Sequence, residues 1–195
     1  MRSEDIRLSK YMSFVLRHRP ETAGLVMDER GWASVDALVE ACIQAGHAGS
    51  RDDVLRVVTE NDKQRFELSS EGDLIRAAQG HSINLELGLA PVAPPPVLFH
   101  GTVEAVVDRI RAEGVRPMGR THVHLSGDSE TARRVGLRRG SPVVLHVDAA
   151  AMSQSGFEFF EASNGVWLVA EVPAEYLAVS EPQTDAEHRE PDGKA

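Results

Sequence analysis

Hydrophobic residues in the first sixty positions recur at the spacing of amphipathic helices. A stripe over residues 8–15 predicts a first helix, which must end at Pro20 because proline cannot continue a helix. Two serines stand where the N-caps of further helices are expected. Ser34 precedes a stripe that ends near Gly46, and Ser50 precedes a third stripe. The pattern therefore predicts three short helices at the start of the chain.

The periodicity then changes to that of strands. Residues 65–68 and 74–77 flank a polar turn and predict a β-hairpin, which together with the helices favours a winged-helix-like lobe. After residue 96 the pattern predicts a helix at about 104–112 and several strands. These strands are expected at residues 97–100, where the strand ends at Gly101, and at 122–125, 143–147 and 166–172. We therefore expect an α+β protein whose second lobe has a mainly β core.

A proline-rich segment divides the chain. Three consecutive prolines within residues 91–96 can neither continue a helix nor pair inside a sheet. We expect a first lobe over residues 1–90, a stiff hinge over 91–96 and a second lobe over 97–180. The polar residues 181–195 are expected to form a disordered acidic tail.

Composition narrows the classes of function. The 195 residues carry a formal net charge of −9, which argues against long-range attraction to nucleic acid, so a bound polyanion must be held by a local group of arginines. The single cysteine, Cys42, excludes an intrachain disulfide and a cysteine-based zinc site, and it is expected to be a small buried residue. No apolar run is long enough to cross a membrane and no signal peptide is visible, so we expect a cytoplasmic protein.

Candidate phosphate ligands come from the first lobe. Arg17 and His18 lie at the predicted end of a helix, where they either complement the helix dipole or clamp a phosphate with arginine's bidentate fork. Arg65 opens the hairpin, and as an isolated residue it is a solvated arginine. The small and polar segment Gln79, Gly80, His81 and Ser82 is either a plain turn or a place where backbone approaches a ligand.

The second lobe offers a different set of side chains. His100, Gly101 and Thr102 follow a strand, and the glycine would permit close backbone contact with a ligand. His122, His124 and Ser126 share one face of a strand. Zinc binding by the histidine pair lacks an obvious third ligand. Arg138 and Arg139 belong to a basic run, which is either a solvated face or a seat for an RNA backbone.

Several segments, in their order along the chain, resemble the NAD-dependent RNA 2′-phosphotransferases of the KptA type. The resemblance runs from about Leu8 to Leu177 and rests on short blocks that are weak singly and specific together. The blocks are residues 8–10, 16–18, 61–66, 76–82, 98–102, 119–126, 142–149 and 164–168.

The resemblance implies both a reaction and a site. The family removes an internal RNA 2′-phosphate through an ADP-ribosylated intermediate and a transesterification, which yield 2′-hydroxyl RNA, ADP-ribose 1″,2″-cyclic phosphate and nicotinamide. Its essential tetrad would fall on four residues of this chain, Arg17, His18, Arg65 and Arg120. The second lobe would resemble the ADP-ribosyltransferase fold.

The resemblance also implies the partners. NAD is consumed as a co-substrate, and the residues that would hold it are His100, Gly101, Thr102, His124 and Ser126. We also expect the RNA to contact Gln79, Gly80, His81 and Ser82 and, on the grounds of charge, Arg138 and Arg139 of the basic run. The third position of the NAD-binding triad, often glutamate in transferases that modify proteins, falls at or near the apolar Val166. No metal and no membrane is implied, and a monomer is expected.

Two alternatives stay open at this stage. The same scaffold can cap terminal phosphates of RNA or DNA with ADP-ribose and stop after the first step. A non-catalytic winged-helix protein that binds nucleic acid and senses NAD is the second alternative, and the presence of all four tetrad residues counts against it.

Overall fold

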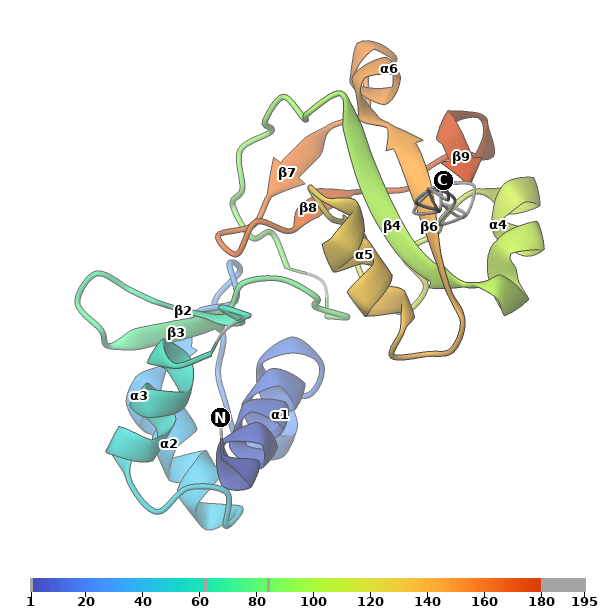
Figure 1. Ribbon diagram of the computed structural model, residues 1–195. Helices are drawn as coiled ribbons and strands as arrows, with labels where there is room; N and C mark the ends of the chain where they lie inside the picture. The colour runs from blue at the N-terminus through green and yellow to red at the C-terminus, as the bar shows by residue number, and fades with distance from the viewer. Residues whose placement is uncertain (1, 62, 84, 180–195) are drawn as a thin grey trace, which may run out of the picture.

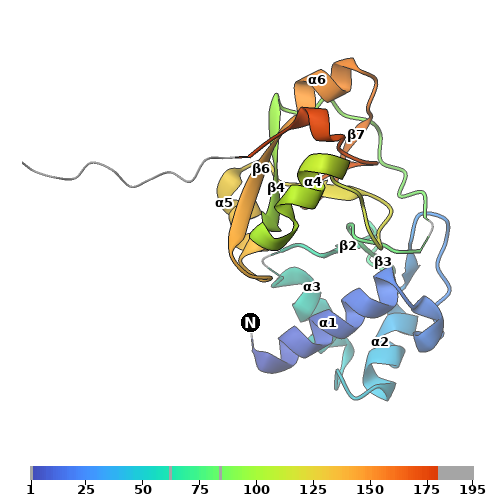
Figure 2. The same cartoon turned by 90° about the vertical axis from the view of Figure 1, so that its right-hand side faces the viewer.

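The computed structural model describes residues 2–61, 63–83 and 85–179, and these form a mixed helix-and-sheet protein. Figure 1 shows the helices α1–α3 grouped at one end of the molecule and the longer strands with α4–α6 at the other. The same grouping is seen from the side in Figure 2. The α+β prediction is confirmed at this level.

The N-terminal half forms three helices and a small antiparallel sheet. The elements are α1 (Ser3–Arg17), η1 (Pro20–Ala23), β1 (Ala33–Ser34), α2 (Val35–Gln44), α3 (Arg51–Thr59), β2 (Phe66–Leu68) and β3 (Leu74–Ala77), with strand order β1-β3-β2. Both predicted caps are present, because the side chain of Ser34 accepts a hydrogen bond from Ala37 N and that of Ser50 accepts one from Asp53 N. The three predicted helices and the hairpin are confirmed.

The C-terminal half forms two three-stranded antiparallel sheets. One has the order β4-β6-β9 and the other β5-β8-β7. The strands are β4 (Val97–Val103), β5 (Val123–Leu125), β6 (Pro142–Asp148), β7 (Phe159–Glu161), β8 (Trp167–Val169) and β9 (Leu177–Val179). The helical segments are η2 (Glu104–Val106), α4 (Val107–Glu113), α5 (Ser129–Gly136), α6 (Ala149–Gln154) and η3 (Ala174–Tyr176).

The prediction that the first of these strands ends at Gly101 is wrong. β4 continues to Val103, and Gly101 pairs with Val144 in the middle of the β4–β6 ladder. A Cβ added at Gly101 would lie 1.8 Å from the backbone oxygen of Ala132 in α5. The glycine is therefore needed because a helix packs directly on the strand, a contact that leaves no trace in local periodicity.

Other elements were shorter than predicted or were missed. The strand expected at 166–172 covers only Trp167–Val169, and Val172 forms an isolated bridge with Val115 instead. Helix α5 was not predicted; it includes Arg133 and Arg134, and Arg138 and Arg139 of the same basic run follow it. This helix is short and strongly polar on its outer side, so few apolar positions mark it in the sequence.

Each half has its own apolar core. The first core contains residues between Leu8 and Ala77, including Cys42, which is fully buried as expected. The second contains residues between Leu98 and Val172. Residues 91–96 form neither helix nor strand, and no helix in the described part of the chain could cross a membrane. The predicted tail at 181–195 lies outside the described residues.

Hydrogen bonds join the two halves. The turn between β7 and β8 contacts the hairpin of the first half, with Ser163 Oγ donating to Glu67 Oε1 over 2.5 Å and Asn164 Nδ2 to the Lys63 carbonyl over 3.3 Å. Closer to the candidate site, Thr121 N donates to the His81 carbonyl over 3.2 Å. These contacts bring the end of α1 towards the segment that precedes β5.

Candidate active site

The C-terminal end of α1 carries a half-buried arginine with two buried nitrogens that have no partner. Arg17 is the last residue of α1, and its Nε and Nη2 atoms have neither solvent access nor a hydrogen-bond acceptor. Burial, and after it the positive charges of Arg65 and Arg120, lower the pKa of this guanidinium to about 10. The group stays charged at neutral pH, although burying an unpaired charge is costly. An uncompensated cation of this kind is expected where an anion binds.

Arg65 and Arg120 approach Arg17 from distant parts of the chain. Arg65 precedes β2 and donates from Nη1 to Asn61 Oδ1 over 3.2 Å. Arg120 precedes β5 and contacts His124 Nδ1 from Nη1 over 2.6 Å. Within the described residues, none of these three arginines is paired with a carboxylate. We call Arg17, Arg65 and Arg120 the arginine cluster.

Two further arginines add to the positive potential. The pKa of Arg65 is lowered by burial and then by the charge of Arg138, and the pKa of Arg120 by burial and then by the charge of Arg139. The basic run after α5 therefore lies within electrostatic reach of the cluster. In an acidic protein this local concentration of cations is the part best suited to a phosphate group.

His18 is oriented by the segment that follows the hairpin. Its Nδ1 lies 2.9 Å from Ser82 Oγ, and Ser82 N donates to the Arg17 carbonyl over 3.0 Å. A Cβ added at Gly80, whose φ is +92°, would lie 3.6 Å from the Arg17 side chain. Burial, and then the charges of Arg17 and Arg120, lower the pKa of His18. The imidazole next to the arginine cluster is thus kept neutral more readily than an ordinary histidine.

Hydrogen bonds indicate which ring nitrogen carries the hydrogen in His100 and in His124. His100 Nδ1 lies 3.1 Å from the His124 carbonyl oxygen, which only accepts, so Nδ1 carries the hydrogen and Nε2 is left as an acceptor. His124 accepts at Nδ1 from Arg120, so its hydrogen is on Nε2. Burial, followed by the charges of Arg120 and Arg17, lowers the pKa of His124 to about 3. The acceptor at His100 Nε2 can bind a hydroxyl group.

Comparison with known sequences decides the family. The sequence model of the RNA 2′-phosphotransferase, Tpt1 / KptA family matches residues 3–171. The chain belongs to this family. Its relatives include three proteins named probable RNA 2′-phosphotransferase. The one from Streptomyces coelicolor is 52% identical over 177 residues, which cover 91% of this chain and 96% of the relative. Those from Burkholderia pseudomallei and Trichormus variabilis are each 50% identical, over 88% and 90% of this chain and 93% and 96% of theirs.

The fold brings together residues from both halves that the sequence resemblance selected. Arg17, His18, Arg65 and Arg120 gather at one place, and Arg120 connects this group to His124 by a direct hydrogen bond. The phosphate and NAD residues expected from the resemblance are therefore neighbours, which no spacing in the sequence showed.

Other predicted site residues are engaged in the scaffold. Thr102 is 7% exposed, and Ser126 exchanges two backbone hydrogen bonds with Phe99, so its backbone is already paired. His122 contacts Thr121 Oγ1 from Nδ1 and packs edge-on against Phe160. Within the described residues, no three metal-binding side chains gather at metal-binding distances.

One residue of the site received no role from the sequence. Asn61 is 3% exposed, accepts from Arg65 Nη1 and donates from Nδ2 to Ser9 Oγ over 3.2 Å. It fixes the Arg65 side chain against α1. The block that contains Asn61 carried part of the family resemblance, and this was the only signal that could have pointed to it.

His81 is buried between the two halves with both ring nitrogens unpartnered. Its exposure is 1%, and burial, followed by the charge of Arg17, lowers its pKa to about 4. In the unfolded chain the pKa returns to the ordinary value of about 6.5. The unfolded state therefore binds a proton that the folded state refuses when the pH falls below this value.

We predict that stability falls on mild acidification because of such histidines. The pKa values in the folded protein are about 4 for His81 and about 3 for His124. Each histidine should therefore lower the free energy of unfolding by about 2 kcal/mol when the pH falls from about 7 to about 5. Replacing His81 with leucine should reduce this fall by about 2 kcal/mol, since one titrating group is removed. Urea unfolding at several pH values measures the effect. Equal pH slopes for the variant and the natural protein would contradict the assignment.

Proposed function

We propose that the protein removes an internal 2′-phosphate from RNA by transferring it to NAD. The observation that carries this proposal is the arginine cluster, three cations from both halves without a carboxylate among the described residues, joined to His124. A phosphate monoester supplies the negative charge that the cluster lacks. The curated relatives are named as probable RNA 2′-phosphotransferases, which supports the same substrate.

The proposed reaction has two steps. The 2′-phosphate oxygen forms a bond to the anomeric carbon of the ribose while the bond to nicotinamide breaks. The neighbouring 2″-hydroxyl then loses its proton and forms a bond to phosphorus, the bond from phosphorus to the RNA 2′-oxygen breaks, and that oxygen takes up a proton, so that no net proton is gained or lost in this step. The products are 2′-hydroxyl RNA, ADP-ribose 1″,2″-cyclic phosphate and nicotinamide.

The residues of this chain have separate roles in the proposal. The arginine cluster binds the phosphate oxygens and stabilises the charge that accumulates on them, because its donors are already aimed and desolvated. His18, oriented by Ser82, contacts the phosphate or carries the proton that the RNA oxygen takes up. When bound, NAD supplies the electrophilic carbon, and His100 orients its ribose through the acceptor at Nε2.

The proposed function also includes a fold for each of the two lobes. The three helices and the β1-β3-β2 sheet support a winged-helix-like first lobe over residues 1–90, linked by the hinge at 91–96. The two sheets of the second lobe, residues 97–180, support an ADP-ribosyltransferase-like fold. We propose that Gln79, Gly80, Arg138 and Arg139 contribute to the phosphate surroundings, that no metal takes part, and that the protein acts as a cytoplasmic monomer.

The test uses NAD and a short RNA that carries one internal 2′-phosphate. We expect the 2′-hydroxyl RNA and ADP-ribose 1″,2″-cyclic phosphate to form in equal amounts, and mass spectrometry measures both products. The same RNA without the 2′-phosphate is the control and should leave NAD intact. A persistent ADP-ribosylated RNA would support the terminal-capping alternative, which an RNA with a terminal phosphate tests directly. Binding of both ligands without any turnover would support the sensor alternative.

A further inference from the structure

Two hollows flank helix α1 on opposite faces. The first, with a volume of about 270 Å³, is lined by the start of α1 and by the segment between α2 and α3. The second, of about 460 Å³, runs along the other face, from Ile6 at its far end to Arg17, His18 and Arg65 of the candidate active site. We call this second hollow the α1 groove. It has the size of a typical ligand site and opens directly onto the arginine cluster.

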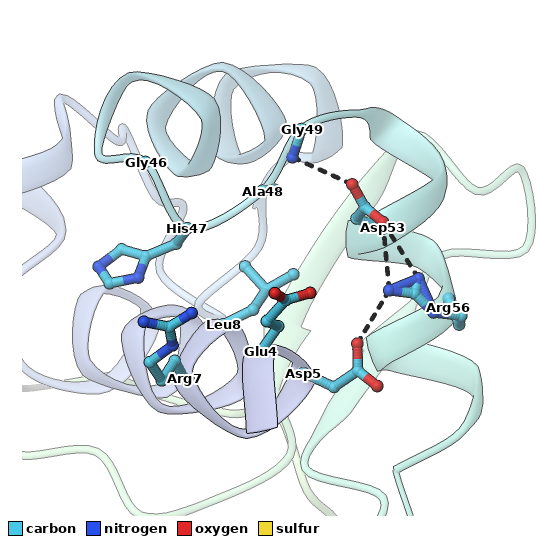
Figure 3. Close-up of a pocket in the computed structure, with 10 residues that line it drawn as sticks. All are labelled: Glu4, Asp5, Arg7, Leu8, Gly46, His47, Ala48, Gly49, Asp53 and Arg56. Carbon is cyan, nitrogen blue, oxygen red and sulfur yellow. Dashed lines mark hydrogen bonds and ion pairs between the residues drawn. The ribbon is translucent and has the colours of Figure 1, made fainter. Parts of the chain in front are cut away.

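Three charged side chains of the first hollow, Asp5, Asp53 and Arg56, pair with one another. Arg56 donates to Asp5 over 2.8 Å and to Asp53 over 3.1 Å, and Gly49 N donates to Asp53 over 3.0 Å, as Figure 3 shows. Glu4 adds another carboxylate to the lining. Among the described residues that line this hollow, carboxylates accompany the two arginines, so it is poorly suited to a polyanion.

The α1 groove is lined by cations. The described residues that line it include Lys10 and Lys63 besides the active-site cations, and they include no carboxylate. Lys10 is exposed on α1, and Lys63 is exposed beside the site. Such a lining attracts the backbone of a nucleic acid locally in a protein whose net charge is −9.

One of the side chains that line this groove is an exposed aromatic ring. Phe14 is 46% exposed, which is unusual for a phenylalanine, and its ring centroid lies 6.4 Å from that of His18. It lies one helical turn before the candidate active site. Exposed aromatic rings beside lysines are the platform on which proteins stack the bases of single-stranded nucleic acids.

We propose that the α1 groove binds the RNA strand next to the 2′-phosphate, with a base stacked on Phe14 and a backbone phosphate held by Lys10. This inference rests on the proposed function, because the 2′-phosphate in the arginine cluster sets the register of the strand. Stacking is tolerant of base identity, since every base presents a π-face. The groove would therefore extend recognition beyond the phosphate without selecting a sequence.

The experiment is a thermodynamic cycle measured by fluorescence anisotropy without NAD. One RNA carries the 2′-phosphate with bases on both sides, and the other has abasic positions on both sides. Phe14→Ala is expected to weaken binding of the first RNA about tenfold. Removing the bases is expected to weaken binding to the natural protein by the same factor. If the ring stacks on a base, the variant should bind the abasic RNA little more weakly than it binds the first RNA. Phe14→Tyr should restore the affinity. Ile43→Ala, at 44% exposure on α2, is the matched control and should change neither affinity.

The salt dependence separates the lysine from the ring. Lys10→Gln should reduce the slope of log affinity against log salt by about 0.7, the value for one phosphate contact on a single strand. Arg111→Gln, which removes an exposed cation on α4, a helix that does not line the groove, should leave the slope unchanged. Additive losses in the cycle, or equal slope changes for the two variants, would overturn the proposal.

Failure of the groove and failure of the proposed function give different results. If the protein turns over the 2′-phosphorylated RNA and the cycle shows no coupling, only the groove assignment is wrong. If the cycle shows coupling and NAD is never consumed, the groove binds RNA and the proposed reaction is wrong. Phe14 is exposed, so its replacement is not expected to unfold the protein, and thermal melting of the variant checks this.

Discussion

Replacing Arg17 with methionine is expected to abolish phosphate transfer and to raise the stability of the free protein. Transfer should fall at least about a thousandfold, because the variant loses a rigid donor aimed at the developing charge. Stability should rise by about 1–3 kcal/mol, because an unpaired buried cation is replaced by an apolar side chain of similar length. The opposite signs follow from the two unpartnered nitrogens of Arg17.

The expected gain in stability follows from the electrostatics of the arginine cluster. The pKa of Arg17 is lowered to about 10 by burial and by the neighbouring arginines. At neutral pH the folded protein therefore carries a charge that is more stable in the unfolded chain, and the penalty is lifted only above pH 10 or when an anion binds. Inorganic phosphate at a hundredfold its dissociation constant should stabilise the natural protein by about 2.7 kcal/mol. It should stabilise the Arg17→Met variant much less.

The matched control lies two residues away. Arg19 is exposed and its Nη1 lies 3.4 Å from Glu21 Oε1, so Arg19→Met removes a charge from the same helix end without touching the cluster. We expect its effects on turnover and on the free energy of unfolding to be small, within about 0.5 kcal/mol for the latter. Urea unfolding and the turnover assay with 2′-phosphorylated RNA measure both quantities. A destabilised Arg17→Met protein would show that Arg17 has a structural partner.

Replacing Gly101 with alanine is expected to destabilise the protein by more than about 3 kcal/mol. The new Cβ would lie 1.8 Å from the Ala132 carbonyl oxygen and 2.6 Å from its carbon, far inside contact distance. Both are backbone atoms of α5, so no side-chain movement can relieve the clash. The same helix and strand also approach closely at a second glycine, because a Cβ added at Gly136 of α5 would lie 2.4 Å from the Thr102 carbonyl oxygen of β4.

Two further variants distinguish packing from ligand binding. Gly127→Ala lies between β5 and α5, where an added Cβ meets nothing within 4 Å, and it should leave the midpoint of chemical unfolding unchanged. Ala132→Gly should not rescue Gly101→Ala, because the obstructing atoms belong to the backbone. Loss of NAD binding by Gly101→Ala with unchanged stability would mean that the glycine serves the ligand and not the helix.

The packing of Gly101 against α5 changes the interpretation of the segment from His100 to Thr102. The sequence presented a histidine, a glycine and a threonine that looked like the end of a strand beside a ligand. The structure instead puts them inside β4, between β6 and the helix α5. The packing of Gly101 against α5 and the burial of Thr102 have structural reasons of their own, and the NAD-binding role of the three residues stays a prediction.

Local patterns predicted the N-terminal half closely. The helix stripes, the caps at Ser34 and Ser50 and the hairpin all depend on residues a few positions apart, so they are readable from the sequence. The C-terminal half was predicted less well, and α5, α6, β7 and β9 were missed. These are short elements that are stabilised by contacts with distant strands, and such contacts leave little periodicity in the elements themselves.

The same division holds for the candidate site. Residue types and their order along the chain were enough to select Arg17, His18, Arg65 and Arg120 through the family resemblance. The sequence alone could not show that Arg17 is unpartnered, that Asn61 holds Arg65, or that Arg120 donates to His124. Burial and pairing depend on which segments meet across the two halves. Electrostatic energy depends on these distances and not on separation along the chain, so only the tertiary structure decides it.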